Sequence, residues 1–291
     1  MSLDNPALII GGQPKAGTSS LFHWLSQHPD TAPSRVKEVR FFLDKGYPLP
    51  SGARYNGKNA DQYLKFFGKA PGEKTLLDAS PDYLYSDNAL NIPDVLPNAR
   101  IVFILRDPVE RIVSWYKFCA QIGRLDRNMT FDDFIRYQLE NEVTDTTPIH
   151  LRGLEHNRVG KYLPPFQKRF GDRCLVVDFA DMKRAPQDFV QNVCRFAGLD
   201  PDFFDGFDFM AQNVSESERA SRLSRVYFES RAAFNYWLNP SEKTLSLLRP
   251  AARRIKRVLS RSEPLEHISI ATDIEIKIKE GSAISAKGQT R

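Results

Sequence analysis

The chain alternates short apolar runs with segments whose apolar residues recur at helical spacing. Runs of the first kind predict four strands, at residues 7–12, 75–79, 100–106 and 174–179. The first, third and fourth are apolar almost throughout, which is typical of strands covered by helices on both faces. Helical spacing is found in residues 17–27, 60–67, 108–119, 131–140 and 186–197. This alternation predicts an α/β fold with a central, mainly parallel sheet flanked by helices.

The length of 291 residues fits one domain of this class, so we predict a single domain over residues 1–291. Its 41% hydrophobic and 26% charged residues exclude extensive disorder. Residues 226–291 differ from the rest and predict a helical and β extension. In it, a basic helix pattern at residues 245–259 precedes an alternating series that predicts one or two half-buried strands: Ile268, Ile270, Ile274, Ile276 and Ile278.

Charge and composition exclude some classes of protein without naming a function. The net charge of +5 favours anionic ligands, but these include nucleotides, nucleic acids, sulfated sugars and membranes. The three cysteines are scattered and the five histidines lack ligand spacing, so we expect no metal site. No apolar run reaches the length of a transmembrane segment, and the N-terminus lacks the pattern of a signal peptide. We therefore expect a cytoplasmic location.

The segment after the first strand, GGQPKAGTSS at residues 11–20, has the composition of a phosphate-binding loop. Glycines allow close backbone approach, the amides at a helix start bind anions, and a lysine adds a full positive charge. It differs from the loop of nucleoside triphosphatases, in which the lysine directly follows the last glycine, because Lys15 precedes Gly17. The other interpretation is a plain strand-to-helix turn capped by a hydroxyl side chain.

A second segment, RDPVERIVSWY at residues 106–116, follows the third predicted strand. Ligands of open α/β sheets bind at the carboxyl ends of strands, which places Arg106 beside an anion. The guanidinium of Arg106 and the hydroxyl of Ser114 are suited to bind one phosphate. Alternatively, Asp107 caps a helix while Arg106 and Arg111 form ordinary salt bridges.

Together, the two segments resemble the sulfotransferases that use 3′-phosphoadenosine-5′-phosphosulfate (PAPS). PKAGTSSL resembles their 5′-phosphosulfate-binding loop, and RDPVERIVSWY resembles their 3′-phosphate motif RxPxxRxxSxY. The resemblance covers about residues 7–225 and implies a P-loop-like three-layer fold, PAPS as sulfuryl donor and no metal. It implies that the nucleotide is bound by Lys15, Ala16, Gly17, Thr18, Ser19, Ser20, Arg106, Ser114, Tyr162 and Arg219.

Two of these residues, Tyr162 and Arg219, are assigned from shorter matches to the family's sequence patterns. Tyr162 ends a G-x-Y pattern at residues 160–162. Arg219 lies where related enzymes carry a basic K-G-R loop, but residues 217–221 (SERAS) retain only the arginine. The lysine and the glycine of the K-G-R pattern are therefore absent from this segment.

The segment VKEVRFF at residues 36–42 resembles the K-E-x-[HR]-F-F segment of glycosaminoglycan-type sulfotransferases. The resemblance implies that Glu38 is the catalytic base, with Lys15 and Lys37 as catalytic cations. Burial beside the phenylalanines is expected to raise the pKa of Glu38 towards neutrality, and Lys37 is expected to oppose this. Without the resemblance, the residues favour an exposed edge of alternating Lys, Glu and Arg side chains.

A further segment, DASPDY at residues 78–83, resembles the S-P-x-Y segment beside the acceptor. The resemblance implies that Asp78 and Ser80 bind the acceptor, or that one of them orients the acceptor or Glu38. A turn at the end of a strand fits the same residues.

The resemblance is to the heparan-sulfate-type branch, here as a soluble, bacterial-like member. It implies O-sulfation of a small molecule, a saccharide, a lipid-linked saccharide or a secondary metabolite, and it leaves an N-acceptor open. Two other functions fit parts of the sequence: a P-loop nucleotide kinase, and a non-enzymatic protein that binds nucleic acid or anionic membranes through basic residues 249–261. The displaced lysine argues against the first, and a solvated basic helix face explains the second pattern more simply. We therefore expect no nucleic-acid partner.

Overall fold

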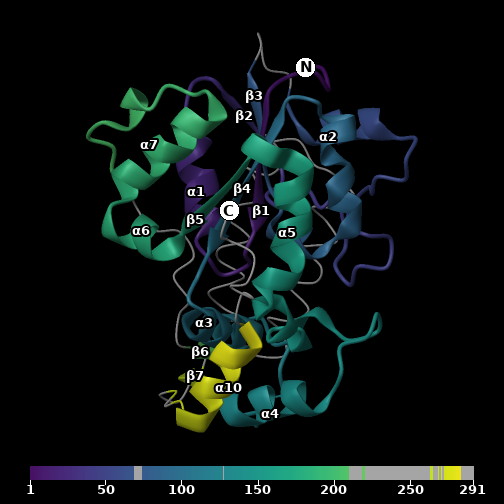
Figure 1. Cartoon of the computed structure of the whole chain (residues 1–291), viewed down its shortest axis with the longest axis vertical. Coiled ribbons are helices and arrows are strands. Elements are labelled where there is room, and N and C mark those ends of the chain that lie inside the picture. The colour runs from purple at the N-terminus through teal and green to yellow at the C-terminus, as the bar shows by residue number, and fades with distance from the viewer. Residues whose placement is uncertain are drawn as a thin grey trace. The chain divides into compact units, whose positions relative to one another are not determined.

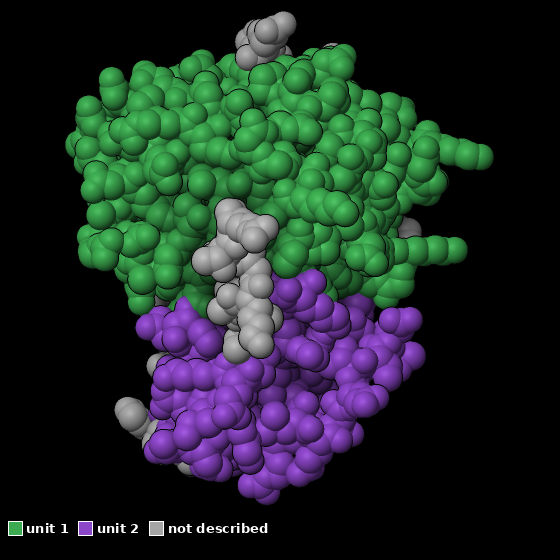
Figure 2. All heavy atoms as spheres, viewed as in Figure 1, with its two compact units in different colours: residues 1–47, 51–106, 162–214 green, residues 48–50, 107–161, 215–291 purple. Residues whose placement is uncertain are grey.

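The computed structural model describes residues 1–68, 74–126, 128–209, 218–219, 263–264, 268, 270 and 272–282. The chain divides into two compact units, coloured separately in Figure 2. Unit 1 comprises residues 1–47, 51–106 and 162–214, and unit 2 comprises residues 48–50, 107–161 and 215–291. The prediction of a single domain stays a prediction.

Unit 1 is built on a five-stranded parallel sheet in the order β2-β3-β1-β4-β5. The strands are β1 (Ala7–Gly12), β2 (Thr31–Pro33), β3 (Thr75–Ala79), β4 (Ala99–Leu105) and β5 (Cys174–Asp178). All four predicted strands are present, and β2, with only three residues, was missed. The residues of β5 are less buried than predicted because this strand forms an edge of the sheet.

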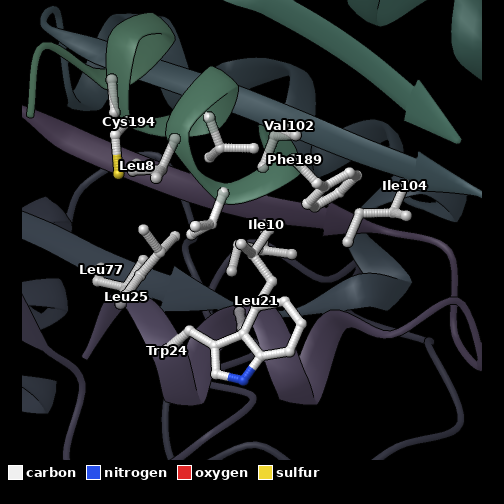
Figure 3. Close-up of a cluster of buried hydrophobic side chains, with 14 of the residues drawn as sticks. Leu8, Ile10, Leu21, Trp24, Leu25, Leu77, Val102, Ile104, Phe189 and Cys194 are labelled. Atoms are coloured by element: carbon white, nitrogen blue, oxygen red, sulfur yellow. The ribbon is translucent and has the colours of Figure 1, made fainter. Parts of the chain in front are cut away.

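Helices cover both faces of this sheet, which confirms the predicted fold class (Figure 1). One face carries α1 (Thr18–Leu25), α6 (Phe179–Arg184) and α7 (Pro186–Ala197). Figure 3 shows Leu8, Ile10 and Val102 of the central strands directed towards Leu21 and Trp24 of α1 and Phe189 of α7. The alternate residues of β4 face the other side of the sheet. There the ring centroid of Phe103 lies 5.1 Å from that of Phe166 in α5 (Val159–Phe170).

Short helices connect these elements of unit 1. They are α2 (Ile92–Val95) and the 3₁₀ helices η1 (Ala60–Phe66), η2 (Pro81–Tyr85), η3 (Asp87–Asn91), η6 (Gly171–Arg173) and η7 (Asp202–Phe204). The segment predicted as a helix at residues 60–67 is thus a 3₁₀ helix. Helix α5 was missed because it contains Pro164 and Pro165, which argue against a helix interior.

Unit 2 is mainly helical in its described part. Its elements are α3 (Pro108–Gln121), α4 (Phe131–Glu140), η4 (Ile149–Leu151), η5 (Glu155–Asn157), α10 (Thr272–Ser282) and the antiparallel pair β6 (Glu218–Arg219) and β7 (Glu263–Pro264). Asp107 caps α3, because its Oδ1 accepts the N–H groups of Val109 at 3.0 Å and Glu110 at 2.9 Å. Arg111 is fully buried and donates to Asn157 Oδ1 and to the carbonyl of Gly153.

The predicted strands at residues 268–278 are wrong, since residues 272–282 form α10. Ile274 and Ile278 are four residues apart and therefore share one helix face, which packs on the apolar cluster around α3. Ile278 is 1% exposed, whereas Ile276 is 50% exposed. The alternation of isoleucines concealed this helical spacing. The basic helix predicted at residues 245–259 lies outside the described residues.

We expect Gly11→Ala to destabilise unit 1 and Gly46→Ala to leave it unchanged. A Cβ on Gly11 would lie 2.7 Å from Ile101 Cδ1 and 2.8 Å from Phe103 Cε1, inside a filled layer. Such overpacking costs about 1–3 kcal/mol. Among the described residues, nothing lies within 4 Å of a Cβ on Gly46. Urea denaturation of both variants measures the difference, and equal free energies of unfolding would contradict this packing.

Candidate nucleotide and acceptor site

The loops that carry most of the predicted site residues leave the sheet at one edge. Because strands β1 to β4 are parallel, their carboxyl ends share that edge, where α/β proteins bind ligands. The segments concerned are residues 11–17 after β1, 34–40 after β2, 78–82 after β3, and Arg106 after β4. At Gly12 the loop approaches η2 closely, since a Cβ there would lie 3.2 Å from the carbonyl oxygen of Pro81.

The loop after β1 leads directly into α1, an arrangement typical of phosphate-binding loops. Gly17 has a φ of 81°, and a Cβ on it would lie 2.6 Å from Met182 Sδ and 2.7 Å from Phe179 Cε2, so only glycine fits. Amides in the first turn of a helix have no carbonyl partner inside the helix, and those of Thr18 and Ser19 belong to this turn of α1. The amides of Ala16 and Ser20 already donate to Gln13 O at 3.2 Å and Gly17 O at 3.0 Å.

Arg106 is bound directly to this loop. Its Nη1 donates to the carbonyl oxygen of Lys15 at 2.9 Å, and its backbone N–H donates to Gln13 Oε1 at 3.3 Å. Its guanidinium also lies 4.7 Å from the ring centroid of Phe179. The structure thus places Arg106, the first residue of the second motif, against the first motif. Gln13 and Phe179 were missed: Gln13 has no distinctive spacing, and Phe179 follows β5, far away in the sequence.

Ser114, Tyr162 and Arg219 were also predicted to bind the nucleotide. Ser114 is buried in α3 of unit 2, whereas Arg106 is in unit 1, so their shared phosphate stays a prediction. Tyr162 packs edge to face on Tyr85, with ring centroids 5.1 Å apart. Arg219 lies in β6, and its side chain is outside the described part of the chain.

Glu38 is held between two cations of its own segment. Its Oε2 accepts from Nε of Arg40 at 3.1 Å and also from Nη2 of Arg40, and its Oε1 lies 3.5 Å from Nζ of Lys37. Burial raises the pKa of this carboxyl, but Arg40 and then Lys37 outweigh it and lower the pKa to about 2. The expected pKa near neutrality is therefore wrong. The sequence predicted that Lys37 lowers the pKa of Glu38, but the larger effect of Arg40 was not predicted.

Asp78 and Ser80 are buried next to this segment, with exposed fractions of 0% and 1%. Ser80 Oγ donates to Asp78 Oδ1 at 2.8 Å, while the hydroxyls of Tyr83 and Tyr63 donate to Oδ2 at 3.1 Å and 3.3 Å. Burial raises the pKa of Asp78 to about 6, although the three hydroxyl groups oppose the rise. The predicted contact of Asp78 and Ser80 with the acceptor stays a prediction.

Asp82 is a second buried carboxyl of this cluster and was missed, because it stands at the variable position of S-P-x-Y. It is 6% exposed, and the hydroxyl of Tyr47 donates to its Oδ1 at 2.9 Å. Burial raises its pKa to about 6, with a further increase from the negative charge of Glu38 and an opposing effect of Arg40. The site thus contains one strongly acidic and two weakly acidic carboxyl groups.

These features define an α/β protein with an anion-binding loop and an adjacent carboxylate cluster. The profile of the sulfotransferase family matches residues 53–205, which is more than half of the chain. The chain belongs to the sulfotransferase family. This confirms the predicted membership among PAPS-dependent sulfotransferases and the enzyme class, that of sulfuryl transfer.

Two individual relatives of the chain are also named as sulfotransferases. The chain is 27% identical over 217 residues to human bifunctional heparan sulfate N-deacetylase/N-sulfotransferase 2, covering 67% of this chain and 22% of that protein. It is 28% identical over 165 residues to the membrane-associated sulfotransferase kil1 of Dictyostelium discoideum, covering 56% and 32%. The chain thus spans about a fifth to a third of these relatives' lengths.

A solved structure supports the fold. The sulfotransferase from Alicyclobacillus acidocaldarius superposes with a TM-score of 0.58 at 22% identity, covering 88% of this chain and 96% of that one. The P-loop-like three-layer architecture predicted from the sequence is confirmed at the level of the fold. Among the described residues, no helix has the length and apolar character needed to cross a membrane. No group of three or more His, Cys, Asp or Glu side chains in that part of the chain is arranged to hold a metal ion.

We expect Asp82→Asn to stabilise the protein at pH 7 but not at pH 4. A folded-state pKa of about 6 lies above the ordinary value of about 3.9, so the wild type loses stability as the pH rises between these values. Asparagine still accepts the Tyr47 hydroxyl and has no charge to bury. The gain at pH 7 should approach about 3 kcal/mol, because each unit of pKa corresponds to about 1.4 kcal/mol. Urea denaturation at both pH values measures it, and a pH-independent difference would contradict the burial of this charge.

Proposed function

We propose that this sulfotransferase moves the sulfuryl group of PAPS to a hydroxyl of a saccharide or secondary-metabolite acceptor, with Glu38 as general base. The observation that carries the donor site is the 2.9 Å hydrogen bond from Arg106 to the carbonyl of Lys15, which joins the loop after β1 to the first residue of the second motif; both residues lie in unit 1. The family profile supports the reaction class. It disfavours both the kinase and the non-enzymatic binding function.

In this proposal, the loop after β1 binds the 5′ end of the nucleotide. Free amides at the start of α1, with the hydroxyls of Thr18 and Ser19, hold the 5′-phosphosulfate. The ammonium of Lys15 stabilises the negative charge that develops on the oxygen between phosphorus and sulfur. Lys15 itself has a left-handed φ of 73°, which directs its carbonyl to Arg106.

Other residues hold the rest of the nucleotide. Arg106 and Ser114 bind the 3′-phosphate, for which a planar guanidinium and a hydroxyl are suitable donors. Tyr162 borders the nucleotide, and Arg219 contacts it from the loop at residues 217–221, which retains the arginine of the K-G-R pattern. A phosphate bound to Arg106 is further stabilised because Phe179 holds that guanidinium in place. The roles of Arg106, Ser114, Tyr162 and Arg219 follow the resemblance, whereas that of Phe179 follows from the structure.

When bound, PAPS supplies an activated sulfuryl group on its 5′-phosphate. Glu38 removes the proton of the acceptor hydroxyl while that oxygen bonds to sulfur, and the bond from sulfur to the phosphate oxygen breaks. A carboxyl with a pKa of about 2 is a weak base, but it is fully ionised at neutral pH. The hydroxyl proton becomes strongly acidic as its oxygen bonds to sulfur, so a weak base suffices late in the step. Lys37 keeps Oε1 of Glu38 oriented at 3.5 Å.

The acceptor is proposed at the level of its class. The name of the human relative specifies a heparan sulfate N-sulfotransferase, which supports a saccharide and keeps an N-acceptor as the alternative. Soluble and lipid-linked saccharides both fit the proposal. The bacterial-like character and the cytoplasmic location also remain proposals, and cell fractionation with an antibody to this chain tests the location.

Arg106→Ala should weaken binding of the desulfated product 3′-phosphoadenosine-5′-phosphate by roughly 10–100-fold, since a hydrogen bond to a charged group contributes about 1.5–3 kcal/mol. Gly17→Ala should weaken it too, because a Cβ would displace the loop from Phe179 and Met182. Arg100 is the matched control: it lies near the amino end of β4, the strand that ends just before Arg106, and its guanidinium is also near a phenylalanine ring, that of Phe196. Calorimetry of the three variants measures the affinities. Equal loss in Arg100→Ala, or no binding by the wild type, would reject this donor site.

Glu38→Gln should retain nucleotide affinity and lose sulfuryl transfer by about 100-fold or more, because general bases contribute about 10²–10⁴-fold. Radiolabelled PAPS with a panel of acceptors measures the transfer: an unsulfated uronic acid–N-acetylglucosamine oligosaccharide, its de-N-acetylated form, and a phenol. Transfer to the free amine alone would support the N-acceptor. Undiminished transfer by Glu38→Gln would exclude Glu38 as the base.

A further inference from the structure

The segment that carries Glu38 is fastened to η2 through a row of three hydroxyl groups. Ser80 Oγ accepts the N–H of Arg40 at 3.0 Å, Tyr83 Oη accepts the N–H of Phe42 at 3.3 Å, and Ser86 Oγ accepts the N–H of Asp44 at 2.8 Å. We call Ser80, Tyr83 and Ser86 the hydroxyl row. The N–H of Glu38 adds a bond to the carbonyl of Ala79 at 3.1 Å.

The regular spacing of this row follows from the helix type. A 3₁₀ helix repeats every three residues, so side chains three apart lie on the same side of it. Positions 80, 83 and 86 span η2 and its two flanking residues at this interval. The SPDYLYS sequence therefore presents three hydroxyls in one direction, towards the amides of alternate residues in segment 40–44.

This fastening holds a backbone that is unfavourable by itself. Glu38 and Arg40 both have left-handed conformations, with φ of 69° and 58°, although neither is glycine. Such residues persist only where the surrounding structure holds them, and they cluster at functional sites. The left-handed turn allows Arg40 to fold back onto Glu38.

Asp78 orients the two hydroxyls of the row that lie nearest Glu38. Ser80 gives its single hydrogen to Asp78 Oδ1, and Tyr83 gives its hydrogen to Oδ2. Each hydroxyl then has only lone pairs left for the N–H of Arg40 or Phe42. Ser86 is oriented differently, by donating to the carbonyl of Phe42 at 3.0 Å.

We propose that Asp78 is a positioning residue for the transfer reaction, which holds Glu38 in place through the hydroxyls of Ser80 and Tyr83. This inference rests on the proposed function of Glu38 as base. Ionised Asp78 accepts from all its hydroxyl partners at once, whereas a protonated carboxyl must donate at one oxygen and lose one of them. The groups that face it are Tyr63 from η1, Tyr83 from η2, Ser80, and the charge of Lys37. Activity therefore falls as Asp78 becomes protonated, below a pH of about 6.

Tyr83→Phe and Tyr63→Phe form a matched pair for the test. Both tyrosines are fully buried and donate to Oδ2 of Asp78, but in the described structure only Tyr83 also accepts an N–H of the Glu38 segment. Tyr83→Phe should lower kcat by roughly 10–100-fold, the scale of a small misplacement of a reacting group, and leave KM for PAPS unchanged. Tyr63→Phe should retain kcat within about twofold. Equal loss in both variants overturns the proposal.

Amide hydrogen exchange gives a readout that requires no acceptor. The Phe42 amide should exchange at least about tenfold faster in Tyr83→Phe than in Tyr63→Phe, and the amides of both Arg40 and Phe42 should exchange faster in Asp78→Asn. Unchanged exchange at these amides overturns the proposal even if activity falls. If the wild type neither binds the desulfated nucleotide nor transfers sulfate, the proposed function fails, and exchange still decides whether Asp78 fastens this segment.

The pH profile separates Asp78 from the other buried carboxyl. Glu38 has a pKa of about 2, so it produces no decline near pH 6, but Asp82 titrates in the same range as Asp78. The acidic decline of kcat should disappear in Asp78→Asn and persist in Asp82→Asn. A decline that disappears only in Asp82→Asn assigns the control to Asp82 and overturns the proposal.

Discussion

The parallel pairing of β1 between β3 and β4 is the constraint on which the rest of unit 1 depends. It brings three chain segments that are distant in sequence to the same edge: the anion-binding loop, the buried carboxyls after β3, and Arg106. The pairing requires little side-chain volume near the edge. Gly11 leaves room for the side chains of Ile101 and Phe103, and Gly12 leaves room for η2. A wider residue at either position would separate the groups that the site combines.

Electrostatic environment, and not residue type, distinguishes the three carboxyls near that edge. Glu38 keeps partial exposure and two cations, so its negative charge is stabilised. Among the described residues, the hydrogen-bond donors to Asp78 are neutral hydroxyls, and burial dominates its pKa. Asp82 is buried as well and also experiences the charge of Glu38. The permanently ionised carboxyl is also the most accessible of the three, which suits a proton acceptor, whereas the buried pair is suited to structural control.

Local patterns in the sequence predicted the parts of the fold and site that depend on local chemistry. The strands at residues 7–12 and 100–106, the loop with Gly17, and Arg106 at a strand end follow from apolar runs, glycines and the rule on strand ends. What was missed depends on contacts between distant segments. Phe179 reaches the loop from beyond β5, Asp82 acquires its character from burial, and Arg40 reaches Glu38 through a left-handed turn.

The period of η2 has a consequence for how this protein can vary. A hydroxyl in the row can be replaced only by a group that both donates and accepts a hydrogen bond, as Ser80, Tyr83 and Ser86 each do. Adding or removing one residue within η2, however, would rotate every later position by about 120° and direct the next hydroxyl away from segment 40–44. Residues 80–86 therefore have a fixed length but a partly exchangeable composition. Loop design or grafting that aims to reshape the acceptor side should keep this interval intact and place insertions elsewhere, for example near Gly46, where a Cβ meets no described atom within 4 Å.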